Sequence, residues 1–201
     1  MPDDARSIIS GSQSQGWIIQ IRLKQHPEMA RLNPSSINTI RMITFLTHPH
    51  SIKTDVEPVL LDFAGVRAGR AGSCSDNLSN GGFMIEVDHE AGYLKRGRYA
   101  PEHGGAFVDE HPDSKFPFVG FQIPYWEEAI ELCFRTAMAL PSVRSVGWDV
   151  AITDDGPLII EGNCPWAPRL PQGYGTGFLN PERRARLEDA GATLPAPHLP
   201  P

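Results

Sequence analysis

The sequence lacks the features that mark membrane proteins and secreted disulfide-rich proteins. No apolar run approaches the ~20 residues that span a bilayer, and the acidic, polar first segment contains no apolar signal-peptide core. The three cysteines, Cys74, Cys133 and Cys164, are odd in number and include no CxxC pair. This spacing fits a reducing compartment better than a disulfide framework or a zinc site. We therefore expect a cytoplasmic protein without membrane insertion.

An excess of basic charge is also missing. The chain carries 18 Lys and Arg against 24 Asp and Glu, which gives a formal net charge of −6. Proteins that bind a nucleic-acid backbone over a broad surface need clustered Lys and Arg to neutralise its phosphates. The balance of charge therefore argues against nucleic acid as a partner.

Glycine and proline, by contrast, are abundant, with 19 of each among 201 residues, so many turns and shaped loops are expected. The length is sufficient for one substantial domain with its own core. Residues 1–15 are polar and residues 192–201 are rich in proline. We expect both segments to be flexible tails around a single domain at 16–191.

Hydrophobic periodicity predicts an α+β fold. The clearest helix covers 124–141 and opens with a proline. Its apolar stripe, at three- and four-residue spacing, consists of Trp126, Ile130, Cys133, Phe134, Ala137 and Met138. The other expected elements are strands at 17–23, 37–46, 58–69 and 83–88, a hairpin at 145–163, short helices near 28–32 and at 180–191, and an irregular excursion at 93–120. Residues 37–46 are apolar on both faces, which is typical of a strand in the middle of a covered sheet.

The hairpin segment DVAITDDGPLIIEGN, residues 149–163, places polar side chains inside apolar strands. If the turn is a three-residue loop that ends at Gly156, Thr153 faces Pro157 and Asp149 lies directly opposite Glu161. Asn163 then projects from the same face, because side chains alternate along a strand. Two opposed carboxylates repel unless a cation lies between them, and such oxygen ligands suit Mg²⁺ held jointly with nucleotide phosphates.

The residues alone leave other interpretations open. The two carboxylates could simply face solvent, and a two-residue loop would shift the register and separate them. Arg41, within the apolar 37–46 strand, could pair with a core carboxylate, although we favour a guanidinium aimed into a cleft. Asp76 and Asn77 are equally compatible with turn formation and with ligand contact.

The hairpin resembles the metal-binding hairpin of the ATP-grasp superfamily. More narrowly, SSINTIRMITF, GRAGSCSDNLSNGGFMIEVD, FQIPYWEEAIEL and GWDVAITDDGPLIIEGN together resemble the sugar-transfer-associated ATP-grasp proteins, which are related to α-L-glutamate ligases. The resemblance covers roughly residues 16–178. It implies an ATP-grasp-like lobe with a mainly antiparallel sheet flanked by helices.

The resemblance also implies an activity and its cofactors. An ATP-dependent ligase of this type uses ATP and Mg²⁺ to activate a carboxylate as an acylphosphate, which an amine then attacks. The family name points to polysaccharide or cell-surface conjugate biosynthesis and to a small-molecule or sugar-linked substrate. The implied site residues are the metal ligands Asp149, Glu161 and Asn163, the adenine-contacting hinge Gln20, Ile21, Arg22 and Leu23, the phosphate-binding and catalytic Arg41, and the acceptor-side Arg70, Asp76 and Asn77. Many relatives have Glu where this chain has Gln20.

One departure from the family pattern affects the expected activity. Family members carry an N-terminal lobe before the hinge, with a phosphate-binding lysine and a glycine-rich loop. Almost nothing precedes the expected hinge in this sequence, so the resemblance implies a chain without that lobe. The chain therefore resembles a C-terminal portion of the family. It could be part of a longer gene product, require a partner chain that supplies the lobe, or act as a noncatalytic binding or assembly module. A kinase with the same metal hairpin is a further alternative.

Overall fold

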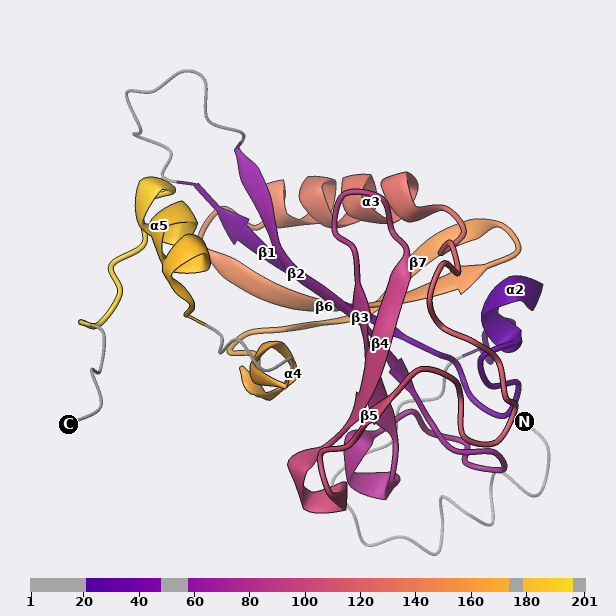
Figure 1. The fold of residues 1–201 in the computed structure, drawn as a ribbon. Helices are drawn as coiled ribbons and strands as arrows, with labels where there is room; N and C mark the ends of the chain where they lie inside the picture. The colour runs from indigo at the N-terminus through magenta and orange to yellow at the C-terminus, as the bar shows by residue number, and fades with distance from the viewer. Residues whose placement is uncertain (1–20, 48–57, 174–178, 197–201) are drawn as a thin grey trace, which may run out of the picture.

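A computed structural model describes residues 21–47, 58–173 and 179–196. Its centre is an antiparallel sheet in the order β5-β4-β3-β2-β1-β6-β7 (Figure 1). The strands are β1 (Ile40–Leu46), β2 (Val59–Ala68), β3 (Phe83–Val87), β4 (Leu94–Tyr99), β5 (Phe107–Val108), β6 (Ser145–Thr153) and β7 (Gly156–Asn163). The helices are α2 (Pro27–Ala30), α3 (Trp126–Met138), α4 (Arg169–Gln172) and α5 (Pro181–Asp189), with short 3₁₀ turns η1 (Leu78–Asn80) and η2 (Pro101–His103). The predicted α+β fold with a mainly antiparallel sheet is confirmed, since each strand runs antiparallel to its hydrogen-bonded neighbours.

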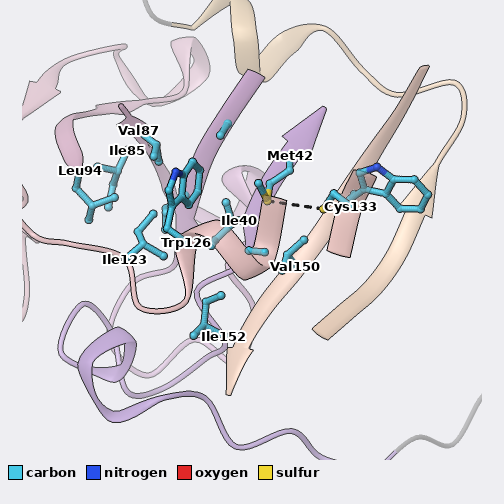
Figure 2. Close-up of a cluster of buried hydrophobic side chains, with 14 of the residues drawn as sticks. Ile40, Met42, Ile85, Val87, Leu94, Ile123, Trp126, Cys133, Val150 and Ile152 are labelled. Atoms are coloured by element: carbon cyan, nitrogen blue, oxygen red, sulfur yellow. Dashed lines mark hydrogen bonds between the residues drawn. The ribbon is translucent and has the colours of Figure 1, made fainter. Parts of the chain in front are cut away.

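Helix α3 lies along one face of the sheet and covers the main hydrophobic core (Figure 1). Figure 2 shows the side chains of this core, which come from α3 and from strands across the sheet. Trp126, Cys133 and Ala137 are buried as predicted, and the Cys133 sulfur lies 3.8 Å from that of Met42. The prediction for Met138 was wrong: it is 49% exposed, because the buried stripe passes through Ala137 at the end of the helix.

Strand β1 occupies the predicted position in the middle of the sheet, between β2 and β6. Ile40 and Met42 face the core under α3, so Arg41 and Ile43 point to the opposite face. There Ile43 packs with Phe63 and Met84 in a second, smaller cluster. We call this side, opposite α3, the polar face. Helix α4 lies on this side of the sheet (Figure 1).

Two predicted segments differ from the structure. Residues 93–120 are not wholly irregular, because β4 and β5 extend the sheet to its edge. Gly97 lies within β4, where a Cβ would lie 2.9 Å from the Phe118 ring, so this position favours glycine for packing rather than for a turn. Residues 17–20 of the expected first strand lie outside the described part of the chain, and residues 21–23 form no strand. Nearby, Gln25 makes only an isolated bridge to Thr153.

The short helices lie close to where the sequence predicts them. Helix α2 begins at Pro27, and α5 begins after Asn180, whose side chain accepts a hydrogen bond from the Arg183 N–H. All three cysteines are free thiols. Among the described residues, no helix combines the length and the apolar character needed to cross a membrane.

Candidate functional site

The β6–β7 hairpin brings the predicted metal ligands to one place. Asp149 pairs with Glu161, as the sequence predicts, and Gly147 pairs with Asn163. The predicted turn was wrong, however, since Thr153 pairs with Gly156 rather than with Pro157 around a two-residue turn. The register shifts between Asp149 and Val150, where one extra residue of β7 forms a bulge. This bulge restores the register that the shorter turn would otherwise have lost.

Glu161 and Asn163 project from the polar face. The intervening Gly162 faces the other side, where a Cβ would lie 2.7 Å from the Trp148 ring. The Asn163 side-chain amide donates to the Glu161 carboxylate at 3.1 Å and to the Gly147 carbonyl at 3.4 Å. Glu161 itself is exposed, so its carboxylate remains accessible to a ligand from solvent.

Asp149 is deeply buried and lies against two guanidiniums. Its exposed fraction is 2%, and that of Arg41, its cross-strand neighbour on β1, is 8%. The Arg41 Nε donates to Asp149 Oδ1 at 2.5 Å and its Nη2 to Oδ2 at 3.2 Å. Arg67 on β2 adds a bond from Nη2 to Oδ2 at 2.8 Å. Arg41 thus pairs with a buried carboxylate, the alternative that the sequence left open, and that carboxylate is one of the predicted metal ligands.

Arg67 is a site residue that the sequence reasoning missed. Besides Asp149, its Nε and Nη2 donate to the Thr39 hydroxyl at 2.9 and 2.8 Å, and its Nε lies 3.6 Å from Asp76. Asp76 in turn accepts hydrogen bonds from the Thr39 backbone N–H and hydroxyl. Strand alternation offered a signal, because Arg67 lies two residues beyond Gly65, the partner of Arg41.

The donor set of the hairpin fits a hard divalent cation only in part. Two carboxylates and an amide supply oxygen ligands from adjacent strands, as Mg²⁺ prefers. Within the described ranges, no three His, Cys, Asp or Glu side chains gather closely enough to hold a metal by themselves. Asp149 also already accepts hydrogen bonds from Arg41 and Arg67. The residues therefore suit an ion that arrives with phosphate oxygens as additional ligands.

The predicted hinge residues lie beside a large cavity. A cavity of about 830 Å³ is lined by Arg22, Leu23 and Lys24, together with residues of the 34–37 segment. Ile21 is 91% exposed and does not line this cavity, and Gln20 lies outside the described residues. Lys24 also pairs with Asp154 in the hairpin turn at 2.7 Å, which connects the hinge segment to β6 and β7.

The predicted acceptor residues are only partly brought together. Arg70 forms a two-point ion pair with Asp113, at 2.8 and 2.6 Å, and this guanidinium with the Ala71 N–H holds the pKa of Asp113 far below its usual range. Asp76 is buried and reaches the hairpin through Arg67. Asn77 is exposed at the start of η1 and makes no side-chain capping bond there. Their predicted role in substrate binding stays a prediction.

Comparison with known protein families decides the classification. The sugar-transfer associated ATP-grasp family matches residues 7–182, which is most of the chain. The chain belongs to this family. No curated protein and no solved structure shows significant similarity to it. Membership of this ATP-grasp family indicates ATP binding and ATP-dependent ligase-type activity.

Proposed function

We propose that this ATP-grasp protein binds Mg-ATP and activates a carboxylate as an acylphosphate, which an amine then attacks. The observation that carries the proposal is the pairing of Asp149 with Glu161, and of Asn163 beside them, on the polar face of one hairpin. The family description supports a role in polysaccharide or cell-surface conjugate biosynthesis. The proposed partner is a small-molecule or sugar-linked substrate.

Each residue of the site has a role that follows from its position. Asp149, Glu161 and Asn163 would hold Mg²⁺, and the ion would neutralise charge on the phosphate oxygens of bound ATP. Arg41 and Arg67 hold the Asp149 carboxylate in place, and their remaining N–H donors suit phosphate oxygens. Water must be kept from the acylphosphate. Asp149 and Arg41 are buried and give the site a floor with little solvent, whereas Glu161 lies on its open side.

In the first step the substrate carboxylate oxygen would form a bond to the γ-phosphorus of ATP, the bond from that phosphorus to the β–γ bridging oxygen would break, and ADP would leave. The amine step then needs no further co-reactant. The amine nitrogen forms a bond to the acyl carbon, the bond from that carbon to the phosphate oxygen breaks, and phosphate leaves while the nitrogen loses a proton. A positive guanidinium near the acyl oxygen stabilises the charge that develops there. Arg41, which is adjacent to the proposed metal ligand, is the residue we assign to this task.

The proposal is tested by calorimetric titration of Mg-ATP into the parent chain and into Glu161→Gln. Glu161 is exposed, so this substitution should leave the melting temperature unchanged. It should weaken Mg-dependent binding by more than about tenfold, because losing even a residue that only supports a metal ligand costs roughly 10–100-fold in affinity. Exposed Glu188→Gln on α5 is the matched control and should bind as the parent does. Equal Mg-ATP affinity of the parent and Glu161→Gln would overturn the proposal.

A noncatalytic binding or assembly role is the second candidate. The observation in its favour is that Asp149 already accepts hydrogen bonds from two guanidiniums. In this case the isolated chain would bind no Mg-ATP until a partner chain is added. A stable phosphorylated product in place of an amide would instead indicate a kinase.

A further inference from the structure

A small pocket on the polar face lies outside the hairpin site and includes none of the predicted acceptor residues. Its volume is about 290 Å³, at the small end of the range for ligand sites. Strands β2 and β3 form its floor, and α4 and α5 form its walls. The lining residues used below are Phe63, Glu86, His89, Glu182, Arg183 and Arg186. We call it the α5 pocket.

The register of the sheet places the α5 pocket beside the proposed reaction centre. Glu86 pairs with Gly65, Gly65 pairs with Arg41, and Arg41 pairs with Asp149. These residues form one row across four strands on the polar face. Because neighbouring strands lie ~4.8 Å apart, Glu86 is roughly 10 Å from Arg41 across the sheet. A ligand in the pocket therefore has one end that faces the proposed reaction centre.

The opposite end of the pocket is formed by two arginines of α5. Arg183 Nε lies 3.0 Å from Asp62 Oδ1, and Arg186 Nη2 lies 2.9 Å from the same oxygen. Asp62 precedes Gly65 by three positions on β2, so this end lies roughly 10 Å along the strand from the Glu86 row. The Arg186 side chain is 42% exposed, and its bonds to Asp62 use only Nη2. A guanidinium has five N–H donors, so Arg186 can bind a further anionic oxygen.

Charges of both signs line the α5 pocket. Glu86 and Glu182 contribute two carboxylates, and Arg183 and Arg186 contribute two guanidiniums. The Glu86 carboxylate is 41% exposed and lies 3.8 Å from Lys95, which is closer to Asp88, at 3.3 Å. Buried Asp62 also pairs with both guanidiniums, so the charges around the pocket are mixed rather than equal in number. Such a lining matches neither a purely anionic nor a purely cationic ligand. It matches a ligand that carries one charge of each sign.

The remaining wall is neutral. His89 accepts a hydrogen bond from the Ala64 N–H at Nε2, at 3.0 Å, so its Nδ1 carries the proton of the neutral ring. Burial, and then the charges of Arg183 and Arg186, hold the pKa of His89 below its usual value. The Phe63 ring stands edge-on to the imidazole with centroids 6.1 Å apart. This wall offers an apolar surface for a short side chain between the charged ends.

We propose that the α5 pocket binds the amine substrate, and that this substrate is a small zwitterion with one ammonium and one carboxylate. The carboxylate binds Arg186 and Arg183, and the ammonium lies at Glu86, toward Arg41. The inference rests on the proposed ligase function, because only an acceptor amine needs to face the acylphosphate. It adds the place and the chemical class of that acceptor.

The test titrates the full chain with each of the common amino acids, and with propionate and ethylamine as ligands that carry only one of the two charges. We expect saturable binding of at least one amino acid and roughly tenfold weaker binding of both single-charge ligands, because each loses a charge-assisted contact. Glu86→Gln and Arg186→Gln should each weaken amino-acid binding to a similar degree. Arg184→Gln, two residues before Arg186 on α5 and paired with Glu188, is the matched control and should bind as the parent does.

The outcomes separate this inference from the proposed function. Glu161→Gln should weaken Mg-ATP binding and leave amino-acid binding unchanged. Glu86→Gln should weaken amino-acid binding and leave Mg-ATP binding unchanged. Glu86 is partly exposed, so its variant keeps the test valid even if Arg186→Gln unfolds. The inference is overturned if no amino acid binds, if propionate binds as tightly as the best amino acid, or if both pocket variants bind like the parent. Failure of Mg-ATP binding alone would overturn the proposed function and with it the acceptor role of the ligand, whereas zwitterion binding in the α5 pocket would still be shown.

Discussion

Replacing Asp149 with Asn removes the carboxylate that the guanidiniums of Arg41 and Arg67 both contact. The side chains of Asp149, Arg41 and Arg67 are only 3%, 9% and 15% exposed, so solvent cannot replace the lost charge. Breaking a buried ion pair by removing one partner costs about 3–5 kcal/mol, because the other charge stays buried and uncompensated. For a domain of this size, that corresponds to a fall in melting temperature of roughly 10 °C.

The assay is thermal unfolding followed by circular dichroism, with urea unfolding as a second measure of the free energy. Asp154→Asn is the matched control on the same hairpin, since its ion pair with Lys24 is exposed and such pairs contribute about 0–1 kcal/mol. Adding Arg41→Met to Asp149→Asn should recover part of the lost stability, because it removes one of the uncompensated charges. If Asp149→Asn melts at the same temperature as Asp154→Asn, the buried ion pairs do not stabilise this fold and the reasoning is refuted.

Three further predictions concern other parts of the fold. Burial and two nearby guanidiniums hold the pKa of His89 below its usual 6.5, so the unfolded chain takes up a proton first as pH falls. Stability should therefore decrease below about pH 6.5, and His89→Gln should flatten this dependence in pH-dependent urea unfolding. Gly92→Ala should unfold at a much lower temperature than Gly72→Ala, because both glycines have positive φ but only a Cβ at Gly92 would overlap the Trp126 ring, at 2.3 Å. Cys133, whose pKa burial raises to about 12, should resist thiol reagents under native conditions while the two exposed cysteines react.

The hairpin shows how far sequence reasoning reaches in this protein. Alternation along β6 and β7 correctly predicts that Asp149 lies opposite Glu161, with Asn163 on the same face. The predicted turn was wrong, because a two-residue turn and a bulge replace the predicted three-residue loop. A bulge depends on how the neighbouring strands pack and twist, and the turn residues alone carry no information about that packing.

Only the part of the site that has a local sequence pattern was predicted. Arg41 was identified because it interrupts an apolar strand, and that pattern is local. Its partner Asp149 is 108 residues away, and Arg67 and Asp62 acquire their partners only when distant elements meet. Charged residues in β4 and β2 therefore gave no signal of the sheet extension or of the α5 pocket.

By itself, the sequence determined the elements whose signals lie within a few residues: the apolar stripe of α3, the Asn180 cap of α5, the central position of β1 and the carboxylate hairpin. Tertiary structure alone decided which charges meet. The strand order places β1 between β2 and β6, and this order brings Arg41 and Arg67 to Asp149. Periodicity and capping are properties of one segment, whereas an ion pair between strands depends on the register of the whole sheet.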